Sequence, residues 1–290
     1  MKTFIFSMLI GGKADETHGV FTTFFARAHH LGEAWDKVRE AAITEGIRDP
    51  VLLEAGESAR LKNKRYEFEY VRLAQSIWRL PVDNLYPLDD PETGFVTPLG
   101  VVPAESNDDL PLRSNFAIEV VQENRFMLEL AASRDEILPA LFKAVRLLPD
   151  IVGLGIGIAH HWDDDLNEFW MNKTSFKSAQ DVESFLNKER LNTLGNGYLD
   201  LVVFARDGDT RLILNEHKIL EFDTPDKTLF SRFVAACSSW GFERLEKCVT
   251  IEFDHFHWHY RPGASLNRKA FIKFLKTQGF ELKDKWENKR

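Results

Sequence analysis

The alternation of apolar and polar residues predicts a chain of short strands interrupted by amphipathic helices. Period-two patterns or short apolar runs indicate strands, and apolar residues at positions i, i+3 and i+4 indicate helices. Strands are expected at 3–10, 20–28, 51–54, 126–132, 151–162, 198–205, 210–221 and 248–260. Helices are expected at 31–45, 137–148, 179–194, 224–241 and 265–278. Residues 66–80 fit either a strand or a helix.

Residues typical of helix ends and turns support several of these boundaries. The sequence from Ser133 to Glu136 matches a capping box, which predicts a helix start. Thr224 followed by Pro225 predicts an N-cap and a first helical turn. Asp207-Gly208 between two strand patterns predicts a β-hairpin.

Residues 81–113 interrupt the pattern with six prolines, many acidic residues and little periodicity. Such composition is typical of a linker or a long surface loop. We therefore predict a small N-terminal α/β (βαβ-like) domain at 1–80, a Pro-rich acidic linker at 81–113 and a C-terminal α+β domain at 114–290. The expected fold class is α+β with two domains, mostly antiparallel sheets and helices packed on one face.

Composition and charge narrow the expected partners. The 290 residues are 44% hydrophobic and carry a net charge of −8, so a packed core is expected and nucleic acid is not an expected partner. The acidic surface could attract a basic protein. No apolar run reaches about 18 residues, so no membrane span is expected. We read the first apolar run as a strand and Cys237 and Cys248 as buried thiols, which predicts a cytoplasmic location.

The segment 251–261 contains the most unusual pattern in the chain. In an extended strand, residues two positions apart share a face, so His255, His257 and His259 would point to the same side. Two such imidazoles can bind one metal ion, and a further ligand must then come from another segment. The expected sources are His160 or His161 and Asp163, which follow another strand.

This nitrogen and oxygen donor set would suit zinc or another divalent ion. The competing interpretation is a half-exposed strand whose rings pack on their neighbours without a metal. No HExxH or similar spaced metal motif is present to decide between them.

Other chemical signatures are absent from the sequence. The pattern Gly153-x-Gly155-x-Gly157 resembles a nucleotide-binding loop but is not followed by a helix, so a closely packed strand is the better interpretation. The chain has no GxSxG nucleophile motif and no phosphate-binding P-loop. No catalytic residue is therefore identified.

Four aromatic residues near the predicted strand ends could form a protein-binding surface: Trp162, Trp170, Trp258 and Tyr260. Exposed aromatic groups often mark binding hot spots. The same residues would serve equally well in the core, because aromatic side chains dominate cores too.

These observations support two functional hypotheses of different classes. The first is a non-catalytic, cytosolic protein-binding module without a cofactor, which neutralises or escorts a basic partner protein as an immunity protein does. The alternative is a metal-dependent hydrolase that uses the histidines of 251–261 with His160, His161 or Asp163. A structural or phage-related protein that works by assembly is a third possibility.

Overall fold

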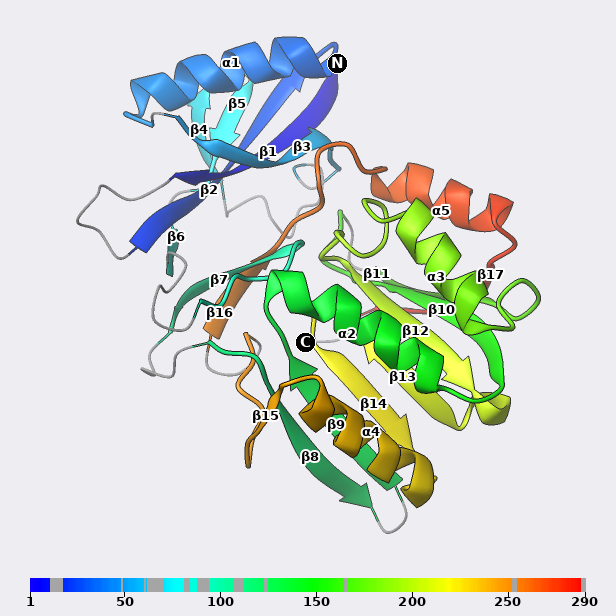
Figure 1. Cartoon of the computed structure of the whole chain (residues 1–290). Helices are drawn as coiled ribbons and strands as arrows, with labels where there is room; N and C mark the ends of the chain where they lie inside the picture. The colour runs from blue at the N-terminus through cyan, green and yellow to red at the C-terminus, as the bar shows by residue number, and fades with distance from the viewer. Residues whose placement is uncertain are drawn as a thin grey trace.

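The protein is an α+β chain in which antiparallel sheets dominate (Figure 1). The computed structural model describes residues 1–10, 18–47, 49–59, 61, 70–80, 84–87, 94–106, 112–122, 125–163, 166–251 and 255–287. These residues form two large sheets and one two-stranded ribbon. None of the helices in this part of the chain is both long and apolar enough to cross a lipid bilayer.

The first sheet, here called the N-terminal sheet, has the strand order β3-β1-β2-β5-β4, with β6 paired to β2. Its strands are β1 (Lys2–Ile10), β2 (His18–Ala28), β3 (Val51–Glu57), β4 (Val71–Ala74), β5 (Ile77–Arg79) and β6 (Asn84–Pro87). Helix α1 (Leu31–Thr44) covers one face (Figure 1). Phe4, Phe6 and Phe24 pack there against Ala34 and Val38 of the helix. Burial of these alternate positions explains why the segment forms a sheet.

The second sheet, here called the main sheet, has the order β15-β8-β9-β14-β13-β12-β10-β11-β17. Its strands are β8 (Asn115–Gln122), β9 (Arg125–Ala131), β10 (Ile151–Ile158), β11 (Leu166–Asn172), β12 (Leu199–Ala205), β13 (Thr210–Leu214), β14 (Leu220–Thr224), β15 (Glu243–Arg244) and β17 (Glu281–Glu287). Among the described strands, β15 and β8 pair in parallel and the other neighbours pair antiparallel.

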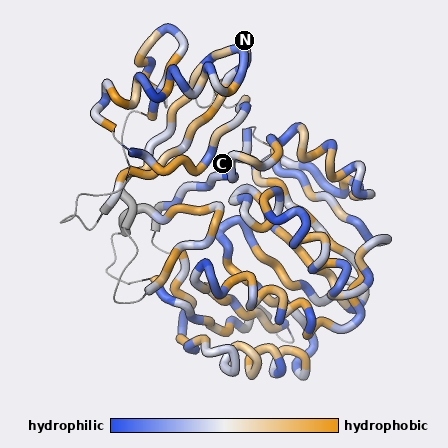
Figure 2. The backbone as a smooth tube through the Cα atoms, turned by 45° about the horizontal axis from the view of Figure 1, so that its top comes forward, coloured by the Kyte–Doolittle hydropathy of each residue, from blue (hydrophilic) through white to orange (hydrophobic). Residues whose placement is uncertain are grey.

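Four helices contribute to one hydrophobic core with the main sheet. They are α2 (Arg134–Leu147), α3 (Ala179–Lys188), α4 (Lys227–Ser239) and α5 (Arg268–Thr277). Figure 2 shows hydrophobic colour along the strands inside the molecule. Strand β10 supplies Leu154, Ile156 and Ile158 to this core, and its glycines alternate with them. A Cβ atom at Gly155 would lie 2.5 Å from the ring of Phe169, so glycine is required by close packing, as the sequence predicts.

The two-stranded ribbon consists of β7 (Val101–Ser106) and β16 (His255–His259) and lies between the two large sheets (Figure 1). Trp258 stacks on Phe21 of β2, with ring centroids 5.7 Å apart. Val102 and Tyr260 complete this apolar contact with the N-terminal sheet. The ribbon thus joins parts of the chain that are far apart in sequence.

Residues 81–113, the predicted linker or long surface loop, contain two short strands. This segment contains β6, which pairs with the N-terminal sheet, and β7, which forms half of the ribbon. Periodicity failed here because each strand is short and its proline residues can occupy edge positions. Two described parts of the segment, β6 and β7, therefore belong to sheets, whereas residues 94–100 and 112–113 lie outside strands.

Several expected boundaries also differ. The strand expected at 210–221 is divided into β13 and β14 by a turn at Asn215–Lys218. Of the strand expected at 248–260, the described residues form β16 alone, and 252–254 lie outside them. The expected helix 179–194 ends at Lys188, and the ambiguous stretch 66–80 contains the β4–β5 hairpin. Strands β8, β11, β15 and β17 were not anticipated. All seven residues of β17 are exposed, so no apolar alternation marked it.

Two expected helix caps are also different. The side chain of Ser133 makes no capping hydrogen bond, because its hydroxyl accepts a hydrogen bond from the backbone N–H of Val96 instead. Helix α4 is capped by Asp226 rather than Thr224, since the Asp226 carboxylate accepts from the backbone N–H groups of Thr228 and Leu229. The predicted hairpin at 206–209 is confirmed between β12 and β13.

Candidate metal centre

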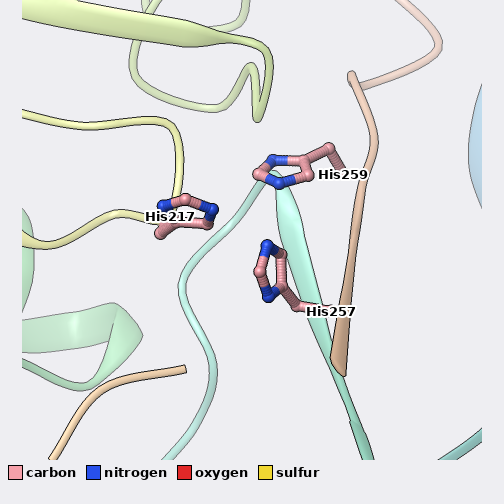
Figure 3. Close-up of side chains that lie close together, drawn as sticks. All are labelled: His217, His257 and His259. Atoms are coloured by element: carbon pink, nitrogen blue, oxygen red, sulfur yellow. The ribbon is translucent and has the colours of Figure 1, made fainter. Parts of the chain in front are cut away.

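Three histidines from two separate elements present ring nitrogens to one another (Figure 3). His257 and His259 lie two positions apart on β16 and share a face, with ring centroids 5.0 Å apart. His217 comes from the turn between β13 and β14, and its centroid lies 4.4 Å from that of His257 and 5.1 Å from that of His259. One nitrogen from each ring lies within 4.8 Å of the other two.

A second set of three donors shares His259. His161, in the loop after β10, has its ring centroid 4.5 Å from that of His259. Its Nε2 atom lies 3.4 Å from Oε2 of Glu216, the residue before His217. His161, Glu216 and His259 each offer one donor atom within 4.8 Å of the others. The two donor sets therefore adjoin at His259 and together comprise five side chains.

Backbone contacts fix the orientation of the central histidine. Nδ1 of His259 lies 2.5 Å from the carbonyl oxygen of Gly197, so this nitrogen carries the proton and donates it to the carbonyl. The Nε2 lone pair is then available to a ligand. Tyr198 holds the same strand end by donating its hydroxyl proton to the carbonyl of His259, at 2.9 Å. Metal-binding histidines commonly have this kind of second hydrogen bond.

Burial favours the neutral form of two imidazoles of this cluster, those of His217 and His259. Removal from water, together with the neighbouring His257 and Lys218, lowers the pKa of His217 to about 4. Burial, reinforced by His161, His217 and His257, lowers the pKa of His259 well below its ordinary value. Neutral imidazoles have the free lone pairs that a metal ion requires.

The turn that contributes Glu216 and His217 is tightly held. The Asn215 side chain accepts a hydrogen bond from the backbone N–H of Ile219, and Lys218 has a φ of 65°. The backbone N–H of Glu216 donates to Asp200 at 2.8 Å. Burial lowers the pKa of Lys218 to about 8, and its ammonium group donates to the carbonyl of Asn196. The positions of both donor residues are thus defined by the fold.

The structure brings together part of the histidine set expected from the sequence. His257 and His259 lie in the cluster, and His161 is beside them. The side chain of His255 is outside the described residues, and the pairing register of β16 with β7 shifts between His255 and His257. The regular alternation on which the prediction relied is therefore established for His257 and His259.

Two expected ligands have other positions. The ring of His160 contacts that of His161, at 5.2 Å between centroids, but His160 belongs to neither donor set among the described residues. Asp163 lies at the N-terminal sheet instead, where its carboxylate accepts hydrogen bonds from the Ser58 hydroxyl at 2.6 Å and from the Ala59 backbone at 3.2 Å. The chain turns at Asp163, which has a φ of 68°, and its side chain points toward Ser58 and Ala59.

Glu216 and His217 are not among the site residues that the sequence predicts. His217 falls inside the strand expected at 210–221, and nothing in the sequence relates this position to a strand forty residues later. The adjacent Glu-His pair in a turn between strands is the signal that could have suggested a site.

The four aromatic residues proposed for protein binding are mainly core residues. Trp162, Trp170 and Tyr260 are buried, with exposed fractions of 2%, 4% and 4%. Trp258 is half-buried against Phe21. Apolar neighbours cover the three buried rings in this conformation. A protein partner could therefore contact them only after a rearrangement of the chain.

No protein-family model matches the chain, and neither a curated protein nor a solved structure shows significant similarity to it.

Proposed function

We propose that the protein binds one divalent transition metal ion, with zinc the first candidate, through His217, His257 and His259. The observation that supports this proposal is the convergence of three imidazole nitrogens within 4.8 Å of one another. Imidazole nitrogen is a preferred ligand for zinc, copper, nickel and iron. His257 and His259 come from strand β16, and His217 comes from the turn before β14. Backbone hydrogen bonds hold both elements in place.

The donor distances fit a small contraction on metal binding. Zinc–nitrogen bonds of about 2.0–2.1 Å in a tetrahedron separate two ligand nitrogens by about 3.3 Å. Side-chain rotations that move each nitrogen by about 1 Å bring the three donors to that spacing. The Gly197 carbonyl already selects the His259 tautomer in which Nε2 is free.

The experiment is a metal titration of protein purified without a histidine tag. We expect about one zinc ion per chain by elemental analysis, and a melting temperature that rises with zinc and falls with a chelator. H257N and H217N should each lower zinc affinity by at least about 100-fold, because removing one of three ligands destroys the site. H29N, which removes an exposed histidine, is the matched control. Stoichiometric metal in both site variants would contradict the proposal.

A metal-dependent hydrolase is a second candidate function. The observation that favours it is the second donor set, because two histidines and one carboxylate are the ligands of several zinc hydrolases. The hydrolytic role requires a metal position open to water, where the ion lowers the pKa of bound water. Hydrolysis of activated ester or phosphate probes that is lost with a chelator and restored by zinc would support this role.

A non-catalytic protein-binding role stays a proposal. Its support is the net charge of −8, which favours a basic partner. In this proposal, two domains divided within residues 81–113 clasp a basic partner protein and neutralise or escort it, as an immunity protein does. Co-purification of a basic protein at low salt, released at high salt, is the expected result, and a chain that purifies alone at low salt would oppose it.

A further inference from the structure

We infer that Glu216 is the fourth protein ligand of the proposed metal ion and that His161 positions its carboxylate. This inference rests on the proposed metal-binding function and specifies how the site is completed. It follows from the position of Glu216, from the single free nitrogen of His259 and from the charge that a buried ion introduces.

The position of Glu216 is set by the same turn that carries His217. Its backbone N–H donates to Asp200, and hydrogen bonds between Asn215 and both Lys218 and Ile219 close the turn around it. Its Oε2 atom lies 3.4 Å from Nε2 of His161, and one of its carboxylate oxygens lies within 4.8 Å of a nitrogen of His259. Rotation about the side-chain bonds of Glu216 can therefore bring the carboxylate to an ion bound at His259.

His259 restricts the cluster to one ion. Both donor sets include His259, but its Nδ1 atom is engaged by the Gly197 carbonyl. The remaining nitrogen, Nε2, has one lone pair and can bind one metal ion at a time. An ion on this nitrogen lies beside His217 and His257 on one side and beside the His161–Glu216 pair on the other.

Charge favours coordination by the carboxylate. Three imidazole ligands contribute no charge of their own, so they leave the full double charge of the ion in a half-buried site, next to the buried Lys218. A buried charge is costly unless an opposite charge compensates it. Glu216 is the carboxylate residue in the two donor sets, so its coordination halves the net charge of the centre.

The resulting centre has four protein ligands. A zinc ion with four protein ligands is typical of structural sites, whereas catalytic sites keep one position for water. Such a centre would connect the ribbon to the turn before β14 and would leave no position for hydrolysis. The inference thus opposes the hydrolase candidate and can be tested separately from metal binding itself.

The experiment compares E216Q with E221Q in cobalt and zinc titrations of tag-free protein. Glu221 accepts a hydrogen bond from Asn215 of the same turn but lies outside both donor sets, so E221Q removes a nearby charge without removing a ligand. We expect E216Q to lower metal affinity by about 10- to 100-fold and to change the visible absorption of bound cobalt. E221Q should match the wild type in both measurements.

His161 is a positioning residue, and its variant gives a different result. We expect H161N to weaken metal binding by about 10-fold, since loss of a residue that orients a ligand has effects of this size. The cobalt absorption should remain that of the wild type, because the four ligand atoms are unchanged. A cobalt spectrum altered as in E216Q would show that His161 is itself a ligand and would overturn its assigned role.

Three results would overturn the inference about Glu216 in different ways. Equal affinity and equal cobalt spectra for E216Q and the wild type would show that the fourth position is not Glu216, and the hydrolase candidate would then be favoured. Two metal ions per wild-type chain would contradict the single-ion argument. Binding of no metal by the wild type would instead contradict the proposed function itself.

Discussion

At the scale of single residues, the surroundings decide what each histidine can do. His30 caps helix α1 by accepting a hydrogen bond from the backbone of Glu33, whereas His259 donates to a backbone carbonyl and keeps its other nitrogen free. The residue type alone could not distinguish these roles. The spacing of His257 and His259 on a strand could predict that their rings share a face, since that follows from local geometry.

The two cysteines should be unreactive in the folded protein. Both are buried, and burial raises the pKa of Cys237 and of Cys248 to about 12. The reactive thiolate is then about one part in 10⁴ at pH 8. We expect labelling by a thiol reagent to be at least about 100-fold slower in native protein than in guanidinium chloride, measured by mass spectrometry. Rapid labelling of native protein would contradict the burial of both residues.

Asp223 should contribute to stability above its own titration range. Burial raises the pKa of this carboxyl, but hydrogen bonds from Arg125 and Arg211 and their charges outweigh burial and lower it overall. A carboxyl with a lowered folded-state pKa stabilises the fold above its unfolded pKa of about 3.9 and loses that contribution as pH falls through the folded value. D223N should therefore lose about 1–2 kcal/mol at pH 6 and clearly less near pH 3. Urea unfolding at both pH values tests this, and an equal loss at both would oppose it.

At the scale of elements, the sequence predicts segments with strong periodicity better than it predicts their ends. Strands β1, β2 and β12 and helices α1 and α5 were expected close to where they lie. The turn at 215–218 was missed because apolar residues on both sides continue the strand pattern through it. Because this turn was missed, Glu216 and His217 were also missing from the predicted set of metal ligands.

Contacts made by distant residues were also beyond the sequence. Ser133 matches a capping pattern, but its hydroxyl accepts a hydrogen bond from the backbone of Val96 instead. Asp163 is a predicted metal ligand, but its carboxylate accepts hydrogen bonds from Ser58 and Ala59. Each polar group has one local and one distant partner available. Tertiary structure decides between them, and a local pattern contains no information about that choice.

The loop before β12 should not tolerate a side chain at Gly197. A Cβ atom there would lie 1.8 Å from the carbonyl oxygen of Gly100, and backbone would have to move. G197A should destabilise the fold by about 1–3 kcal/mol, as other overpacked sites do, and should weaken zinc binding because the Gly197 carbonyl orients His259. G195A is the control, since its Cβ atom would lie 3.3 Å from Pro262. Equal unfolding free energies for the two variants in urea would contradict the argument.

At the scale of the whole molecule, a buried ion pair connects the N-terminal sheet to the segment that follows the ribbon. Arg261 Nε lies 3.2 Å from Oε1 of Glu54, and the two side chains are 2% and 4% exposed. The guanidinium group also donates to the carbonyl of Ser265, at 3.0 Å. With the stacking of Trp258 on Phe21, this pair holds the N-terminal sheet beside the ribbon.

Loss of one partner in this pair should be costly. E54Q leaves the guanidinium of Arg261 buried without a compensating charge, which typically costs about 3–5 kcal/mol. E57Q is the control, because Glu57 forms a pair with Lys2 in which the side chains are 42% and 58% exposed, and such pairs contribute little. Chemical denaturation followed by fluorescence measures both. A loss below about 1 kcal/mol in E54Q would show that the ion pair does not hold the sheet.

The same ion pair has a consequence for synthesis of the chain. Glu54 and Arg261 are 207 positions apart, so a ribosome adding about 5–20 residues per second needs roughly 10–40 s between them. Throughout that interval Phe21 and its apolar neighbours lack the cover that Tyr260 and Trp258 later supply. The N-terminal sheet therefore keeps a water-exposed apolar face until Trp258 and Tyr260 have been synthesised. We therefore expect nascent chains halted before residue 258 to bind chaperones and to aggregate more than chains that extend past Tyr260.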